Sequence, residues 1–179
     1  MRVIAGKYRS RTLKAGEHFR PTTDRVRETL FNVLQNQIPD SIFVDVFAGS
    51  GSVGIEAISR GAAKVYFIES NRKALFVFEQ NLEACCEDEF WRILTMDVWK
   101  ALDVLPQQLP TVDIFFFDPP YEFVNYSKLL QHAAKPYPEA TFIVEHSSRN
   151  RLETPMELEE TRSIRIGETT LSFFRKKLQ

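Results

Sequence analysis

Between residues 42 and 146, short apolar runs alternate with segments of helical periodicity. Strands are expected at residues 42–47, 64–69, 92–97, 112–118 and 140–146, and helices at residues 52–61, 71–85, 98–105 and 125–135. Strands that alternate with helices build βαβ units, in which the strands run parallel and the helices cover both faces of the sheet. The sequence therefore predicts an α/β fold with a doubly wound, mostly parallel sheet of the Rossmann-like kind.

Both ends of the chain add elements to this α/β core. Residues 162–167 and 168–177 are strand-like and meet at Gly167 and Glu168, which is typical of an antiparallel hairpin. A helix is expected to begin at Thr23 or Asp24 and to end before Pro39. We therefore expect a seven-stranded sheet in a single domain, residues 1–179. Residues 1–40 would form an N-terminal extension and residues 41–179 the core.

The net charge of -1 conceals an uneven distribution of charge. Residues 1–27 carry eight Lys and Arg against two acids, residues 162–179 carry five against one, and residues 28–161 carry ten against 21. A basic N-terminal arm can neutralise the phosphates of a nucleic acid, although a solvated basic tail is the simpler alternative. The candidates for RNA contact are Lys7, Arg9, Arg11, Arg25 and Arg27.

The composition, with 44% hydrophobic and 26% charged residues, is that of a globular protein. Its apolar runs are shorter than the roughly 18 residues of a membrane span, and the first residues lack the apolar stretch of a signal peptide. A cytoplasmic protein is therefore expected. The adjacent Cys85 and Cys86 are expected to be reduced thiols, and the three histidines lack metal-ligand spacing, so no metal is predicted.

The segment GSGSVG, Gly49 to Gly54, follows an expected strand and opens an expected helix. Glycines in this position let the backbone turn sharply and approach a ligand closely. Glu69, at the end of the next expected strand, can accept hydrogen bonds from the hydroxyls of a ribose. Taken alone, the pattern fits a dinucleotide as well as a methyl donor.

Two further acids favour the methyl donor S-adenosylmethionine. Asp45, at the end of the first strand, can hold the α-amino group of this cofactor but would lie poorly beside a pyrophosphate. Asp97, at the end of the third strand, can accept from the adenine amine, although it could instead cap the helix that follows. With Glu69 and Asp118, these acids end four strands at the carboxyl edge, where open α/β sheets bind ligands.

The stretch FFFDPPYEF, residues 115–123, ends the fourth strand with prolines that forbid its continuation. In a doubly wound sheet this strand lies beside the first, so Asp118 would face the bound donor. The Asp118 carboxylate and the Pro119 carbonyl can accept from the exocyclic amine of a base, and Asp118 can also take the released proton. Pro120 would keep the turn rigid and Tyr121 would stack on the base. A purely structural turn is the alternative.

Together these motifs resemble a class I S-adenosylmethionine-dependent methyltransferase, and more closely the RsmD family of bacterial 16S ribosomal RNA guanine-N2 methyltransferases. The resemblance rests on RVIAGKYRSRTL (2–13), RPTTDRVRETLFNVL (20–34), DVFAGSGSVGIEAISRGA (45–62), FIES (67–70), TMD (95–97) and FDPPY (117–121). The second block is the most specific, whereas DPPY also occurs in DNA adenine methyltransferases. The first block looks like the opening β-hairpin of the family, so the N-terminal extension is expected to consist of a β-hairpin and a helix. Ala5-Gly6 and Ser10 depart from the family pattern, which puts only the detail of this RNA-facing hairpin in doubt.

The resemblance implies a guanine of 16S rRNA as the substrate, presented on a partly assembled 30S subunit, and a monomer is expected. It implies catalysis by Asp118, Pro119, Pro120 and Tyr121, and a segment from Arg20 to Arg27 that covers the donor and meets RNA. The expected donor contacts are Asp45, Phe47, Ala48, Gly49, Gly51, Glu69, Ser70, Asp97, Val98, Arg20 and Thr22.

Other functions stay open at this point. The acceptor could be an amine of another RNA, of DNA or of a protein, although the chain has no separate domain for recognising a DNA sequence. The same glycine loop could serve a nicotinamide-dependent oxidoreductase. A non-catalytic RNA-binding assembly factor is the remaining alternative, but such a factor has no physical reason to keep four acids around an empty cleft.

Overall fold

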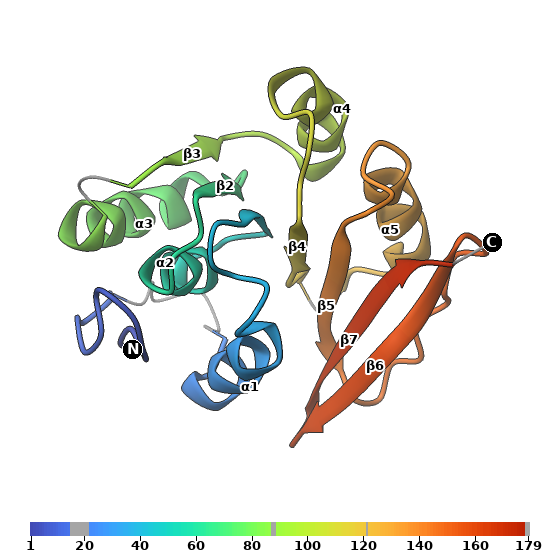
Figure 1. Cartoon of the computed structure of the whole chain (residues 1–179), viewed down its shortest axis with the longest axis horizontal. Coiled ribbons are helices and arrows are strands. Elements are labelled where there is room, and N and C mark those ends of the chain that lie inside the picture. Colours follow the sequence, from blue (N-terminus) through green and yellow to red (C-terminus); the bar gives the residue numbers. More distant parts are fainter. Residues whose placement is uncertain (15–21, 87–88, 121, 178–179) are drawn as a thin grey trace.

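The computed structural model describes residues 1–14, 22–86, 89–120 and 122–177. Within these residues, seven strands form one sheet in the order β3-β2-β1-β4-β5-β7-β6. The parallel strands are β1 (Ile42–Val46), β2 (Lys64–Ile68), β3 (Trp91–Leu94), β4 (Ile114–Phe117) and β5 (Thr141–Ser147). The antiparallel hairpin of β6 (Leu158–Ile166) and β7 (Thr169–Lys176) closes one edge (Figure 1). The predicted fold class and C-terminal hairpin are confirmed.

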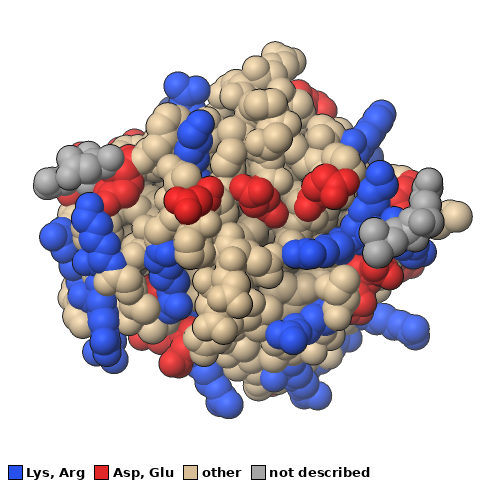
Figure 2. All heavy atoms as spheres, viewed as in Figure 1, with Lys and Arg blue, Asp and Glu red and all other residues tan. Residues whose placement is uncertain are grey.

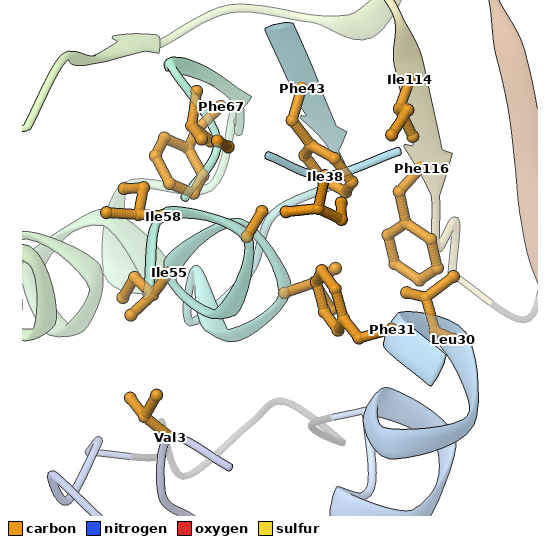
Figure 3. Packing of buried hydrophobic residues seen from close by; sticks show 14 of the residues in the cluster. Val3, Leu30, Phe31, Ile38, Phe43, Ile55, Ile58, Phe67, Ile114 and Phe116 are labelled. Atoms are coloured by element: carbon orange, nitrogen blue, oxygen red, sulfur yellow. The ribbon is translucent and has the colours of Figure 1, made fainter. Parts of the chain in front are cut away.

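The helices cover both faces of the sheet. Helices α1 (Asp24–Leu34), α2 (Ser52–Ser59) and α3 (Arg72–Cys85) pack on one face, and α4 (Val98–Gln108) and α5 (Tyr126–Ala134) on the other. In Figure 3, Phe43 of β1 and Phe116 of β4 point toward Phe31 and Leu30 of α1. No helix of the described residues has both the length and the apolar character needed to cross a membrane.

The run of three phenylalanines in β4 follows from this double cover. Phe116 belongs to the cluster under α1, α2 and α3, whereas Phe115 and Phe117 belong to the cluster under α4 and α5. All three side chains are fully buried. A central parallel strand is covered on both faces, so polar residues return only after β4 ends at Phe117, beginning with Asp118.

Several predicted elements differ from the structure: α4 continues to Gln108 instead of residue 105, and β6 begins at Leu158 instead of residue 162. β3 ends at Leu94 rather than at residue 97, because the Asp97 side chain accepts a hydrogen bond from the Trp99 amide at 2.9 Å and caps α4. The expected hairpin of residues 2–13 contains a single antiparallel bridge, between Arg2 and Thr12. The chain between them forms turns instead of a ladder.

The N-terminal segment, residues 1–14, is packed onto α2. The Lys7 amide donates to the Ser59 carbonyl at 2.7 Å, and the Tyr8 amide donates to the Ser59 hydroxyl at 3.0 Å. Gly6, at φ +84°, approaches so closely that a Cβ there would lie 1.8 Å from the Ser59 carbonyl oxygen. Val3 is buried and lies below Ile55 of α2 in Figure 3. This segment is therefore part of the folded protein and not a loose tail.

Candidate active site

A cavity of about 550 Å³ opens at the carboxyl ends of β1, β2, β4 and β5. Its described lining includes four carboxylates and no Lys or Arg, and the acids are Glu69, Asp118, Glu122 and Glu145. The other lining residues are Thr23, Phe47, Ala48, Gly49, Ser50, Ser70, Asn71, Pro119, Pro120, Tyr126, His146, Ser147 and Thr169. Such a wall favours a ligand that carries positive charge or hydrogen-bond donors.

The loop between β1 and α2 forms one side of the cavity, and Glu69 holds it in place. The Glu69 carboxylate accepts from the Gly49 amide at 2.8 Å and from the Asn71 amide at 2.7 Å. Phe47 has φ +65°, a left-handed conformation that is rare for an aromatic residue and is often found at functional sites. Its ring meets the edge of Phe123, with the two centroids 5.6 Å apart. Of the predicted donor contacts, Phe47, Ala48, Gly49, Glu69 and Ser70 line the cavity.

The three glycines of the loop have different roles. A Cβ on Gly49 would meet nothing closer than the Phe47 carbonyl oxygen at 3.9 Å, so this glycine borders open space. A Cβ on Gly51 would lie 2.1 Å from the Phe78 ring, and one on Gly54 would lie 2.1 Å from the Phe67 ring. Gly51, predicted as a donor contact, is instead required for packing against α3 and is absent from the cavity lining.

Asp45 lies deeper than predicted. It pairs in register with Phe67 and Phe116, which places it two residues before the level of Glu69 and Asp118. Its carboxylate accepts from the Gly54 amide at 2.8 Å, and only 2% of the residue is exposed. Burial raises the pKa of Asp45 well above its usual range, and the Asp118 and Glu69 charges add to this rise. Asp45 supports the loop from beneath, which does not fit the predicted contact with an amino group.

Asp97 and Val98 also lie away from the cavity lining. Asp97 is exposed and caps α4, which was the alternative considered for it, and Val98 is buried in the cluster under α4 and α5. The strand ends before Asp97, so this side chain does not share the position of Glu69 and Asp118.

The turn after β4 forms another part of the cavity lining. The Asp118 amide donates to the Val46 carbonyl at 3.3 Å, which ties the turn to the end of β1. The Thr22 hydroxyl lies 3.3 Å from Asp118 Oδ2 and 3.2 Å from Glu145 Oε2. Pro119 and Pro120 line the cavity beside Asp118. Tyr121 and Arg20, both predicted site residues, lie outside the described residues.

The far wall contains residues that the sequence analysis did not single out. Glu145 and His146 belong to β5, and Tyr126 begins α5. Glu145 directly follows the apolar run ATFIV, as Asp118 follows IFFF, and this position after a buried run is the sequence signal that could have found it. His146 Nε2 lies 3.0 Å from the Ser172 hydroxyl, and burial lowers the pKa of this histidine, so it is neutral near pH 7.

Four of the five basic residues predicted to meet RNA are exposed, and the fifth, Arg27, is buried. Arg9 and Arg25 are exposed, as are Lys7, which forms an ion pair with Glu89 at 2.6 Å, and Arg11, which donates to the Ala84 carbonyl. Figure 2 shows Lys and Arg side chains gathered at the left, where Figure 1 places the N-terminal segment and α3.

Arg27 differs from these exposed residues, because its side chain is fully buried. Its guanidinium lies 2.7 Å from Asp24 Oδ1 and 3.6 Å from Glu56 Oε2, and it donates to the Arg2 carbonyl. The prediction that Arg27 binds RNA is therefore wrong for this structure. Arg27 lies in a basic part of the sequence, but it forms a buried ion pair with Glu56 because α1 packs against α2.

Comparison with known proteins shows relatives of the whole chain. The family described as Conserved hypothetical protein 95 matches residues 1–175. Ribosomal RNA small subunit methyltransferase D of Haemophilus influenzae is 43% identical over 69% of this chain and 65% of that protein. The protein of the same name in Escherichia coli K12 is 38% identical over 86% of this chain and 78% of that protein. The solved structure of yhhF from Escherichia coli matches with a TM-score of 0.84 and 31% identity, over 100% of this chain and 99% of that one.

Proposed function

The chain belongs to the Conserved hypothetical protein 95 family, the RsmD family, and from this premise we propose that it methylates the N2 amine of a guanine in 16S ribosomal RNA. The methyl donor is S-adenosylmethionine. Two relatives are named for small-subunit ribosomal RNA, which supports that class of substrate. We further propose a cytoplasmic monomer that acts on a partly assembled 30S subunit and uses residues 1–40 as its RNA-facing extension.

The observation that carries this proposal is that one cavity contains both the glycine loop and the DPPY turn. Gly49 and Glu69 line this cavity together with Asp118 and Pro119. β1 and β4 are neighbours, with Val46 opposite Phe117, so the loop and the turn start side by side. A cofactor on the loop and a base at the turn would therefore meet in one space.

The residues present fit S-adenosylmethionine. This cofactor carries an ammonium and a sulfonium, and the described wall of the cavity offers four carboxylates and no cation. Glu69 would hold the ribose hydroxyls, Phe47 would contact the adenine, and Gly49 would allow a close approach. When bound, the cofactor supplies a methyl group activated by its positively charged sulfur.

Asp118 and Pro119 act on the acceptor amine, which is a poor nucleophile because its lone pair is delocalised into the guanine ring. Acceptor oxygens hold the amine by its hydrogens and direct its lone pair, and Asp118 takes the released proton. Positioning of the two reactants can lower the activation barrier by about 7–11 kcal/mol. Proton transfer to a side chain typically raises the rate by only ~10²–10⁴-fold. Positioning therefore carries most of the rate. Tyr121 remains predicted as the stacking partner of the base.

The acidic wall argues against the nicotinamide alternative. A pyrophosphate carries two negative charges, which Asp118, Glu122 and Glu145 would repel, whereas Glu69 lies where either cofactor would place a ribose. Calorimetry separates the two cofactors, since we expect micromolar binding of S-adenosylmethionine and none of NAD(H). Binding of NAD(H) alone would favour an oxidoreductase, and binding of neither would favour a non-catalytic RNA-binding factor.

The proposed reaction is tested by transfer of tritiated methyl groups. The acceptors are 30S subunits that lack the modification, free 16S rRNA and DNA, and the labelled product is digested to nucleosides. We expect label in N2-methylguanosine and more transfer to 30S subunits than to free rRNA. Label in an adenine or in DNA would reject guanine N2 of 16S rRNA as the target.

A pair of glycine variants separates stability from cofactor binding. Gly49→Ala and Gly51→Ala both place a methyl group on a residue with positive φ, but only the second meets the Phe78 ring. We expect Gly51→Ala to lose about 1–3 kcal/mol more unfolding free energy than Gly49→Ala. Gly49→Ala should show the larger loss of cofactor affinity. Urea unfolding and calorimetry measure these effects, and the opposite ranking would contradict the roles given to the two glycines.

The exposed basic residues are tested through the salt dependence of RNA binding. Reversing Arg9, Arg11 and Arg25 to Glu should weaken binding and lower the slope of log K against log salt by about 0.7–0.9 for each lost phosphate contact. Affinity for S-adenosylmethionine should stay unchanged. Lys135→Glu, at the end of α5, is the matched control. An unaltered slope in the triple variant would mean that these residues do not meet RNA.

A further inference from the structure

Glu145 is placed beside Asp118 by the sheet itself. In the pairing of β4 with β5, Phe117 lies opposite Val144, so Asp118 and Glu145 are the next residues on neighbouring strands. Both carboxylates contact one oxygen, the Thr22 hydroxyl, at 3.3 and 3.2 Å. Both also line the same cavity. Two acceptors therefore stand next to each other where the proposed function puts the base.

We propose that Glu145 determines the specificity for guanine by accepting the N1–H of the base while Asp118 receives its N2 amine. This inference rests on the proposed function. The Watson–Crick edge of guanine presents N1–H and N2–H₂ as adjacent donors, and an ionised carboxylate is an acceptor only. Adenine and 2-aminopurine present an acceptor at N1, which would face Glu145 without a hydrogen between them.

The position of Glu145 suits this task better than that of Glu122. Glu122 is exposed and lies in the loop after the DPPY turn. Glu145 is partly buried within a strand paired on both sides, and its carboxylate is held by Thr22. A side chain on a strand keeps a fixed orientation when a neighbouring residue also hydrogen-bonds to it. A fixed orientation is needed to recognise the hydrogen-bond donors on one edge of a base.

A fully buried site that hydrogen-bonds a substrate group can disfavour an analogue without that group by about 10⁴–10⁵-fold in kcat/KM. Because Glu145 is only partly buried, we expect a preference for guanine over 2-aminopurine on the order of 100-fold in kcat/KM. Glu145→Gln supplies an amide that can donate to the N1 of 2-aminopurine. The variant should therefore lose activity on guanine, gain activity on 2-aminopurine, and shift the ratio of the two by on the order of 100-fold.

The test uses one RNA in two forms. The methylated guanine is mapped with the unaltered protein, and the RNA is then ligated with guanine or 2-aminopurine at that position and assembled into 30S particles. Methyl transfer to each form is measured for the unaltered protein, Glu145→Gln and Glu153→Gln. Glu153 is an exposed acid outside the lining of the cavity and serves as the control.

The ratio of the two rates decides the outcome. A large shift in the ratio for Glu145→Gln alone supports base reading by Glu145. Equal loss on both RNAs, or no change in either, overturns it, because a structural or proton-accepting role would not distinguish the bases. Failure of the unaltered protein to form N2-methylguanosine at the mapping step would instead reject the proposed function on which this inference rests.

Discussion

Asp118→Ala is expected to reduce methyl transfer by at least about 100-fold while affinity for S-adenosylmethionine changes by less than about threefold. The reason is that Asp118 belongs to the turn after β4, beside the glycine loop and not within it, and we propose that it serves the acceptor amine and not the cofactor. Single-turnover kinetics measures the first effect, and calorimetry measures the second. Asp103→Asn, whose side chain is 65% exposed on α4, is the control.

Asp118→Asn adds information on the role of the carboxylate. Its amide oxygen can still accept from the amine but cannot take a proton. If acceptance dominates, this variant should retain much more activity than Asp118→Ala. If proton removal dominates, the two variants should be equally slow. Full activity in Asp118→Ala would contradict the catalytic assignment altogether.

Glu56→Ala is expected to destabilise the protein by about 3–5 kcal/mol, because it leaves buried partners without their acceptor. The Glu56 carboxylate is fully buried and accepts from the amides of Ile4 and Ala5 at 2.8 and 3.0 Å and from Arg60 Nε at 2.7 Å. It also lies 3.6 Å from the buried guanidinium of Arg27. Urea unfolding measures the loss.

This network joins the N-terminal segment and α1 to α2, the helix that begins at the glycine loop. Glu28→Ala, an exposed acid on α1, should change the unfolding free energy by less than about 0.5 kcal/mol. A loss below about 1 kcal/mol in Glu56→Ala would mean that the buried charges stabilise this junction far less than their geometry implies.

The direction of strand pairing and the place of β4 beside β1 could be predicted because the alternation of elements leaves few alternatives. Alternating strands and helices require parallel pairing, and the hairpin at Gly167 requires an antiparallel edge. The end of β3 could not be predicted, since TMDVW fits a strand that continues to Asp97 as well as a helix that Asp97 caps. Only the packing of α4 decides between them.

The sequence correctly placed Gly49, Glu69 and Asp118 around one cavity, because each directly follows a buried strand at the carboxyl edge of the sheet. The position of Asp45 could not be predicted, because it depends on how deep the residue lies in the sheet. Asp45 ends a strand in the sequence, but register places it beneath the loop. The burial of Arg27 depends on the contact between α1 and α2, which no local pattern reveals.

Every proposed role depends on the glycine loop and the DPPY turn presenting a methyl donor and a base amine to each other in one cavity. A crystal structure with S-adenosylhomocysteine tests it most directly. We expect the adenosyl group to lie against Phe47, Gly49 and Glu69. Its sulfur should face the Asp118 carboxylate and the Pro119 carbonyl across a space for one amine. An adenosyl group bound outside this cavity, or acceptor oxygens turned into the protein interior, would contradict it.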